Sequence, residues 1–199
     1  MAKIFKKFVI VVIIAVAVTG WWFGAYLPFQ KSKMFIEVIR SGSVIKTVDM
    51  LEQRFDAVLG FPSPIGKDEV VGFFADQMVS VLGTKPPKEI GTRLIAYTED
   101  RVRGVLENPR SPELTKVLLK MASLNELGWV VYQNEVYFRA AEKYLYQCLE
   151  VSPNRPQCLY GLFNIYANSG LKAEAKAVGE KIIGFWPEDK VMRSKINLL

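Results

Sequence analysis

Histidine is absent from this chain of 199 residues, and cysteine occurs only twice, as Cys148 and Cys158. Without histidine, the chain lacks the usual general base at neutral pH and the commonest side-chain ligand of transition metals. Two thiols are also too few for a four-cysteine zinc site or a disulfide-rich scaffold. We therefore expect no metal site, no cofactor and no catalytic residues, and a protein that is not an enzyme.

A broad basic face is also lacking, although the formal net charge is +6. Residues 1–40 hold six of the 26 bases and one of the 20 acids, which leaves 20 bases and 19 acids for residues 41–199. Most of the excess charge therefore lies near the N-terminus, and the rest of the chain is nearly neutral. Because binding to nucleic-acid phosphates requires a concentrated basic surface, we predict no nucleic-acid partner.

Charged residues are missing from Phe8–Leu27, a run of 20 residues with the sequence FVIVVIIAVAVTGWWFGAYL. As a helix, this run would be roughly 30 Å long, the thickness of the hydrocarbon core of a bilayer. Lys6 and Lys7 precede the run, and its aromatic residues gather at its C-terminal end, as is typical of a membrane interface. We predict a membrane anchor over residues 1–32, with residues 8–27 inside the bilayer.

A cleaved signal peptide is the alternative to an anchor, because Ala15-Val16-Ala17 has the small-x-small form of a cleavage site. Cleavage there would leave Val18 and a pair of tryptophans close to the new N-terminus, so we favour an uncleaved, single-pass anchor. Three lysines precede the span, and three bases with Glu37 follow it, so the positive-inside bias is slight. We expect the N-terminus inside and the body outside the cytoplasm.

Helix-breaking residues divide the remaining chain into segments of helical length. Apolar residues recur every three or four positions, and no stretch shows the period of two that is typical of strands. The expected helical segments are 35–59, 68–82, 89–106, one that opens at Ser111-Pro112-Glu113, and a final helix over 190–199. The predicted fold class is all-α, with divergent helical hairpins over residues 33–110 and repeats with a capping helix over residues 111–199.

An internal period relates the stretches that end at Pro153 and Pro187, two prolines whose numbers differ by 34. The matching pairs are Ala141 with Ala175, Cys148 with Ile182, Leu149 with Ile183, and Val151 with Phe185. This period resembles that of the tetratricopeptide repeat family, most closely over residues 156–187. The resemblance implies an α-solenoid of helical hairpins. Gly179 stands where the family has an aromatic residue, and Phe163 stands where it has a small one.

In that family, the first helix of each hairpin lines a concave groove that holds a peptide or protein. The resemblance places six residues of this chain in such a groove, with Asn125 on the same helix as the last two: Gln157, Tyr160, Asn164, Asn168, Trp129 and Tyr132. Burying an unpaired asparagine is costly, so we predict a ligand-facing stripe, with a solvated, non-binding surface as the alternative. Tyr160 replaces the lysine with which some members bind a carboxylate, so a clamp for a peptide C-terminus is not expected.

A second resemblance covers more of the chain and rests on the order of its parts. The anchor ends in Leu-Pro-Phe, a Ser-Pro-Ile-Gly-Lys turn follows at residues 63–67, and two tetratricopeptide-like units come last. This order resembles the soluble tail after the last membrane span of O-antigen-ligase-like polymerases, over residues 41–78 and 108–187. The catalytic, polytopic part has no counterpart in this sequence, so the resemblance implies no ligase activity.

These features lead to one functional expectation and one alternative. We expect a membrane-anchored scaffold that binds a protein or peptide partner at the cell envelope. The alternative is an accessory or detached tail module of an O-antigen or polysaccharide polymerase or ligase system.

The two cysteines have two interpretations. Cys148 occupies a packing position of the repeat, and Cys158 opens the next predicted helix. Buried free thiols are the first expectation. A disulfide across the turn between the repeats is the alternative, if the body lies outside the cytoplasm.

Overall fold

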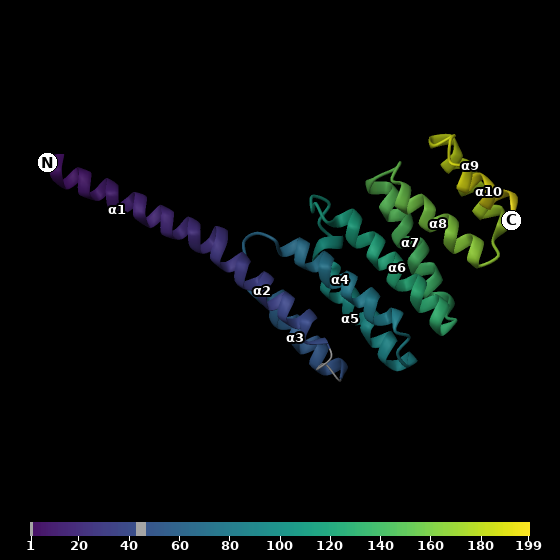
Figure 1. Ribbon diagram of the computed structural model, residues 1–199, viewed down its shortest axis with the longest axis horizontal. Coiled ribbons are helices and arrows are strands. Elements are labelled where there is room, and N and C mark those ends of the chain that lie inside the picture. Colours follow the sequence, from purple (N-terminus) through teal and green to yellow (C-terminus); the bar gives the residue numbers. More distant parts are fainter. Residues whose placement is uncertain (1, 43–46) are drawn as a thin grey trace. The chain divides into compact units, whose positions relative to one another are not determined.

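The computed structural model describes residues 2–42 and 47–199, and this part of the chain is helical, without strands (Figure 1). The predicted all-α fold class is confirmed. Val44 and Ile45, which belong to the first predicted apolar series of the body, lie outside the described residues. The chain divides into two compact units, Met1–Val71 and Gly72–Leu199.

The first unit begins with three consecutive helical elements: α1 (Ala2–Trp21), the π-helix η1 (Trp22–Tyr26) and α2 (Leu27–Arg40). The Leu27 N–H donates to the Trp22 carbonyl, five residues earlier, at the end of η1. Pro28 follows directly and has no N–H, so the α-helical ladder cannot continue through this position. A single π-helical turn inside a longer helix is the usual form of this element, and the helix continues into α2.

α2 packs against α3 (Val48–Gly60) through buried apolar side chains of both helices. The rings of Phe35 and Phe55 lie 6.2 Å apart. The Thr47 hydroxyl caps α3 because it accepts the N–H of Met50. The helix that carries the apolar run therefore ends in a segment with its own tertiary contacts.

Lys31 is almost completely buried, with 2% of its surface exposed. Its ammonium donates to the carbonyls of Leu59 at 3.3 Å and Phe61 at 3.1 Å, where α3 ends. A cation is favourable at this position because the last carbonyls of a helix carry partial negative charge. Lys31 therefore joins α2 to the C-terminal end of α3.

The second unit contains most of α4 (Lys67–Gly83), which begins in the first unit. It also contains α5 (Lys88–Leu106), α6 (Leu114–Tyr132), α7 (Glu135–Val151), α8 (Pro156–Asn168), α9 (Lys172–Phe185) and α10 (Lys190–Asn197). The bounds of α4, α5 and α10 lie within a few residues of the predicted segments, whereas the segment predicted over 35–59 is divided between α2 and α3. α6 begins at Leu114 instead of Pro112, because residues 111–113 form a turn in which the Ser111 hydroxyl accepts the N–H of Glu113. From α5 onward, each helix packs against the next, and α6 also contacts α8.

The period that relates Pro153 to Pro187 is present in the structure as well as in the sequence. α7 ends at Val151 and α9 ends at Phe185, and in both the following N–H returns to the carbonyl four positions earlier. Ala141 and Ala175 are both completely buried. Positions that are one period apart therefore have equivalent places in these two helices.

The two departures from the repeat pattern lie against each other. A Cβ built at Gly179 on α9 would lie 3.2 Å from the ring of Phe163 on α8 and 2.6 Å from Ile196 on α10. Phe163 is itself buried. A large residue on one side of a contact and a glycine on the other conserve the packed volume, which explains why the two departures occur together.

The α5–α7 contact follows a longer offset, of 45 positions. The Tyr137 hydroxyl donates to the Thr92 hydroxyl at 3.1 Å, and the Tyr144 hydroxyl donates to Glu99 at 3.4 Å. Both partners advance by seven positions between the two bonds, so α5 and α7 run parallel in a fixed register. The offset along the chain from α5 to α7 is therefore longer than the period that relates α7 to α9.

Gly91→Ala in α5 is expected to lower the free energy of unfolding by about 1–3 kcal/mol, as overpacking usually does. A Cβ at Gly91 would overlap the Tyr132 ring, whose hydroxyl is held 2.9 Å from the Pro86 carbonyl. The measurement is denaturant unfolding of the full chain in detergent, followed by circular dichroism.

Gly104→Ala is the matched control in the same helix, since a Cβ there meets no atom within 4 Å. Helix propensity predicts that this control gains up to about 1 kcal/mol. Equal shifts for the two variants would contradict the close contact between α5 and α6.

Candidate functional site

The structure divides the six predicted groove residues into two sets. Tyr160, Trp129 and Tyr132 make contacts within the chain. The side chains of Gln157, Asn164 and Asn168 have no hydrogen-bond partner among the described residues, and these three form a line on one side of α8, which we call the amide stripe. The two sets have different capacities to bind a partner.

Tyr160 is bonded to the turn that precedes α10. Its hydroxyl donates to the Asp189 carboxylate, which also caps α10 by accepting the N–H of Met192 at 2.8 Å. Its ring stacks on that of Trp186, with centroids 6.5 Å apart. The hydrogen bond to Asp189, together with burial, raises the pKa of Tyr160 to about 12. Tyr160 is therefore a neutral donor that holds the C-terminal helix, and its hydroxyl is already engaged.

Trp129 and Tyr132, in the last turn of α6, contact different neighbours. The Trp129 ring packs edge-on against Phe138 of α7, with centroids 5.2 Å apart. The Tyr132 hydroxyl donates to the Pro86 carbonyl, just before α5, and its ring lies 6.4 Å from that of Tyr137. Both aromatic residues therefore contribute to the packing between helices.

The amide stripe keeps its hydrogen-bonding groups available. Gln157 and Asn168 are exposed near the two ends of α8, and Asn164 is half-buried between them. The described part of the chain supplies no hydrogen-bond partner for these three side chains. Spacings of seven and four positions place them on one face of the helix. Each amide offers both a donor and an acceptor, the chemistry that recognises a peptide backbone.

Asn125 does not belong to an open surface, and the expectation that it faces a ligand or solvent is wrong. Only 1% of its surface is exposed, and its amide donates to the Met121 carbonyl at 2.9 Å. Its Oδ1 atom has no hydrogen-bond partner among the described residues. The amide is accommodated because it bonds to its own helix one turn back, which residue spacing does not reveal.

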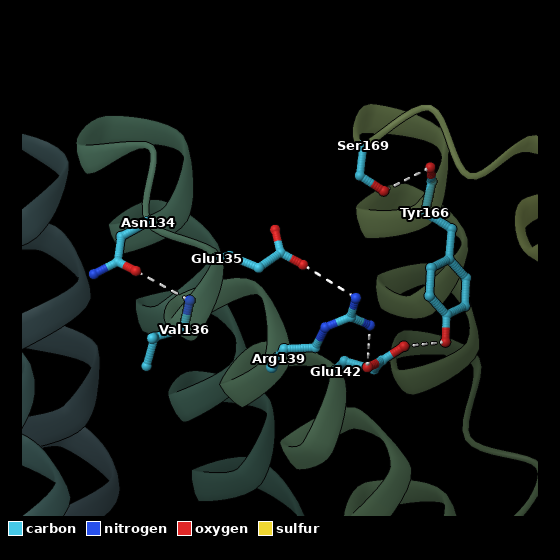
Figure 2. A network of polar contacts seen from close by, with 7 residues as sticks. All are labelled: Asn134, Glu135, Val136, Arg139, Glu142, Tyr166 and Ser169. Atoms are coloured by element: carbon cyan, nitrogen blue, oxygen red, sulfur yellow. Dashed lines mark hydrogen bonds and ion pairs between the residues drawn. The ribbon is translucent and has the colours of Figure 1, made fainter.

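Figure 2 shows a polar network between α7 and α8 that the sequence pattern did not indicate. Glu142 accepts a hydrogen bond from the Tyr166 hydroxyl at 2.7 Å and pairs with Arg139 at 3.4 Å, which also pairs with Glu135 at 3.2 Å. Tyr166 is 4% exposed, and burial together with Tyr146 and Glu142 raises the pKa of its hydroxyl. Tyr166 thus remains a neutral donor, and the network fixes the position of α8 on α7.

Cys148 and Cys158 form a disulfide that joins α7 to α8. The first expectation of free thiols is therefore wrong, and the alternative describes the structure. Both residues are completely buried, next to Leu114 and Leu118 of α6. Cys148 occupies the packing position equivalent to Ile182, and the first turn of α8 brings Cys158 to a Cα–Cα distance of 6.1 Å from it. That distance is within the range of ordinary disulfides.

A second candidate surface, the interhelix cleft, is a hollow of about 650 Å³ between α5, α6 and α7. Its lining combines apolar with charged side chains, among them Leu106, Leu114, Leu118, Glu99, Arg103 and Lys143. Tyr144 crosses from α7 to Glu99 on α5, and burial, with Glu99 beside it, raises the pKa of Tyr144 to about 12. No sequence motif marks the cleft, because its residues come from three helices that are distant along the chain.

The comparisons with known proteins give no relative for this chain: no family model, no curated protein and no solved structure matches it. Among the described residues, no group of three or more histidine, cysteine, aspartate or glutamate side chains is placed to hold a metal ion. The amide stripe and the interhelix cleft are the candidate sites. The amide stripe offers open hydrogen-bonding groups, and the interhelix cleft offers charged and apolar ones, which suit a peptide or protein surface.

Replacing both cysteines, as Cys148→Ala with Cys158→Ala, is expected to lower the free energy of unfolding by about 2–3 kcal/mol. The reason is that the disulfide closes a short loop, with a sequence separation of 10, and so restricts the unfolded chain. Denaturant unfolding with and without a thiol reductant measures the effect. The reductant must destabilise the natural chain and leave the double variant unchanged. Full reactivity of both thiols with an alkylating reagent, in unfolded protein that was never reduced, would contradict the bond.

Proposed function

We propose that the protein is a single-pass, membrane-anchored α-solenoid scaffold, whose tetratricopeptide-like helical pairs bind a protein or peptide partner at the cell envelope. In this proposal the protein is not catalytic. The observation that carries it is the combination in one chain of an uncovered apolar helix and a body in which α7 and α9 repeat the same pattern of buried positions.

The anchor is supported by the exposure of the apolar run. Every residue from 8 to 25 is exposed, and none of the most apolar window of this helix is buried within the described chain. Apolar side chains of this number are stable in a bilayer, where a helix also satisfies its own backbone hydrogen bonds. Trp22 and Tyr26 stack with centroids 4.7 Å apart at the end of the run, as suits an interfacial belt.

The disulfide supports a body outside the cytoplasm. Disulfides persist in oxidising compartments, whereas cytosolic thiols are kept reduced. The Cys148–Cys158 bond is buried between α7 and α8, so it is part of the packed structure of the body. This agrees with the slight positive-inside bias of the lysines before the span.

The partner surface is proposed on α8. The amide stripe is open, while Tyr160 and Tyr166 on the same helix are bonded to the turn before α10 and to α7, and hold α8 in place. A rigid helix with unpaired amides loses little entropy when a peptide binds to it. The interhelix cleft provides apolar area for anchoring side chains of the same partner class.

The test is affinity capture with the full chain from membranes in detergent. Replacing Gln157, Asn164 and Asn168 together by alanine is expected to lower recovery of the specific partner at least tenfold, because each lost amide leaves a peptide group unpaired. The control replaces three exposed residues of the neighbouring helix α9 by alanine: Lys172, Lys176 and Glu180. Equal recovery with both triple variants would overturn the proposed surface on α8.

A further inference from the structure

A pocket of about 510 Å³ lies in the first unit where the apolar run ends, and we call it the membrane-proximal pocket. It is formed by the last residues of the run, by the start of α2 and by the chain that leaves α3. Its lining is mostly apolar and includes two lysines: Phe23, Leu27, Leu59, Phe61, Lys31 and Lys67.

The two lysines make this pocket cationic. An ammonium has three N–H donors, and Lys31 uses two of them for the carbonyls of Leu59 and Phe61. One donor is therefore available to another acceptor. Lys67 is exposed in the first turn of α4, close enough for the two ammonium groups to repel each other. No acidic residue of the described chain lines the pocket, so the repulsion is relieved when an anion binds.

The location of the pocket determines which anion fits it. Leu27 is the last residue of the apolar run, and Lys31 follows one helical turn later, roughly 6 Å along the axis. If residues 8–27 span the bilayer, the ammonium groups lie at the level of the lipid headgroups and Phe23 faces the hydrocarbon. A free inorganic phosphate would use the cations and leave the apolar wall without a partner, whereas a phospholipid uses both.

We propose that the membrane-proximal pocket binds one anionic glycerophospholipid, with its phosphate between Lys31 and Lys67 and an acyl chain along Phe23 and Leu27. This inference rests on the proposed function, because it requires the apolar run to lie in a membrane. The bound lipid bridges α2, α3 and the start of α4, and so stiffens the connection between the anchor and the chain that follows.

The experiment is native mass spectrometry of the full chain in non-ionic detergent, titrated with phosphatidylglycerol or with phosphatidylcholine. The chain is expected to retain one phosphatidylglycerol and to bind phosphatidylcholine at least tenfold more weakly. Lys67→Gln removes one charge-assisted contact and is expected to weaken phosphatidylglycerol binding about tenfold. Lys67 is exposed, so this change leaves the packing intact, whereas Lys31 also holds α3.

Lys33→Gln is the matched control, because Lys33 is an exposed lysine two positions from Lys31 that pairs with Glu37 at 3.8 Å and does not line the pocket. It is expected to change the affinity less than twofold. Equal retention of the two lipids, equal loss in the two variants, or displacement of the lipid by inorganic phosphate would each overturn the inference.

Flotation with vesicles separates the two proposals: a chain that fails to float overturns the anchor and this site together. A chain that floats but shows no preference between the two lipids in the mass-spectrometry titration overturns only this site.

Discussion

The apolar run at residues 8–27 imposes the strongest physical constraint on this molecule. Its side chains are exposed throughout residues 8–25, and the described remainder of the chain does not cover them. In water, such a surface would have to be buried by association, whereas in a bilayer it is at its most stable. The helix continues without a break into α2, where Phe35 packs on Phe55 and Lys31 bonds to the end of α3. The apolar run is thus continuous with a part of the chain that folds on itself.

In the second unit, apolar packing brings the helices together, and specific hydrogen bonds fix their register. The repeat that relates α7 to α9 gives buried small residues at Ala141 and Ala175, so that neighbouring helices approach closely. Phenolic hydroxyls then fix the register, and Tyr166 on Glu142 is one such bond between α7 and α8. Each of these phenols stays neutral because burial or a carboxylate partner raises its pKa. A body held in this way suits the proposed scaffold.

Much of the fold follows from the sequence, because helices depend on local periodicity and on the residues that end them. The helical class and the final helix from Lys190 were predictable for this reason. The candidate sites depend on contacts between distant residues. Asn125 is buried because its amide bonds to its own helix, and Tyr160 is occupied because Asp189 lies opposite it in the folded chain. Neither spacing nor residue type contains that information, and the same holds for the cleft and the pocket, whose walls come from separate helices.

Whether the proposed anchor stays uncleaved is tested by the intact mass of the chain recovered from alkali-washed membranes, together with the mass of any chain left in the soluble fraction. An uncleaved anchor predicts a chain of 22.5 kDa that stays in the washed membrane. A shortened chain that lacks residues 1–17 and appears in the soluble fraction would contradict it.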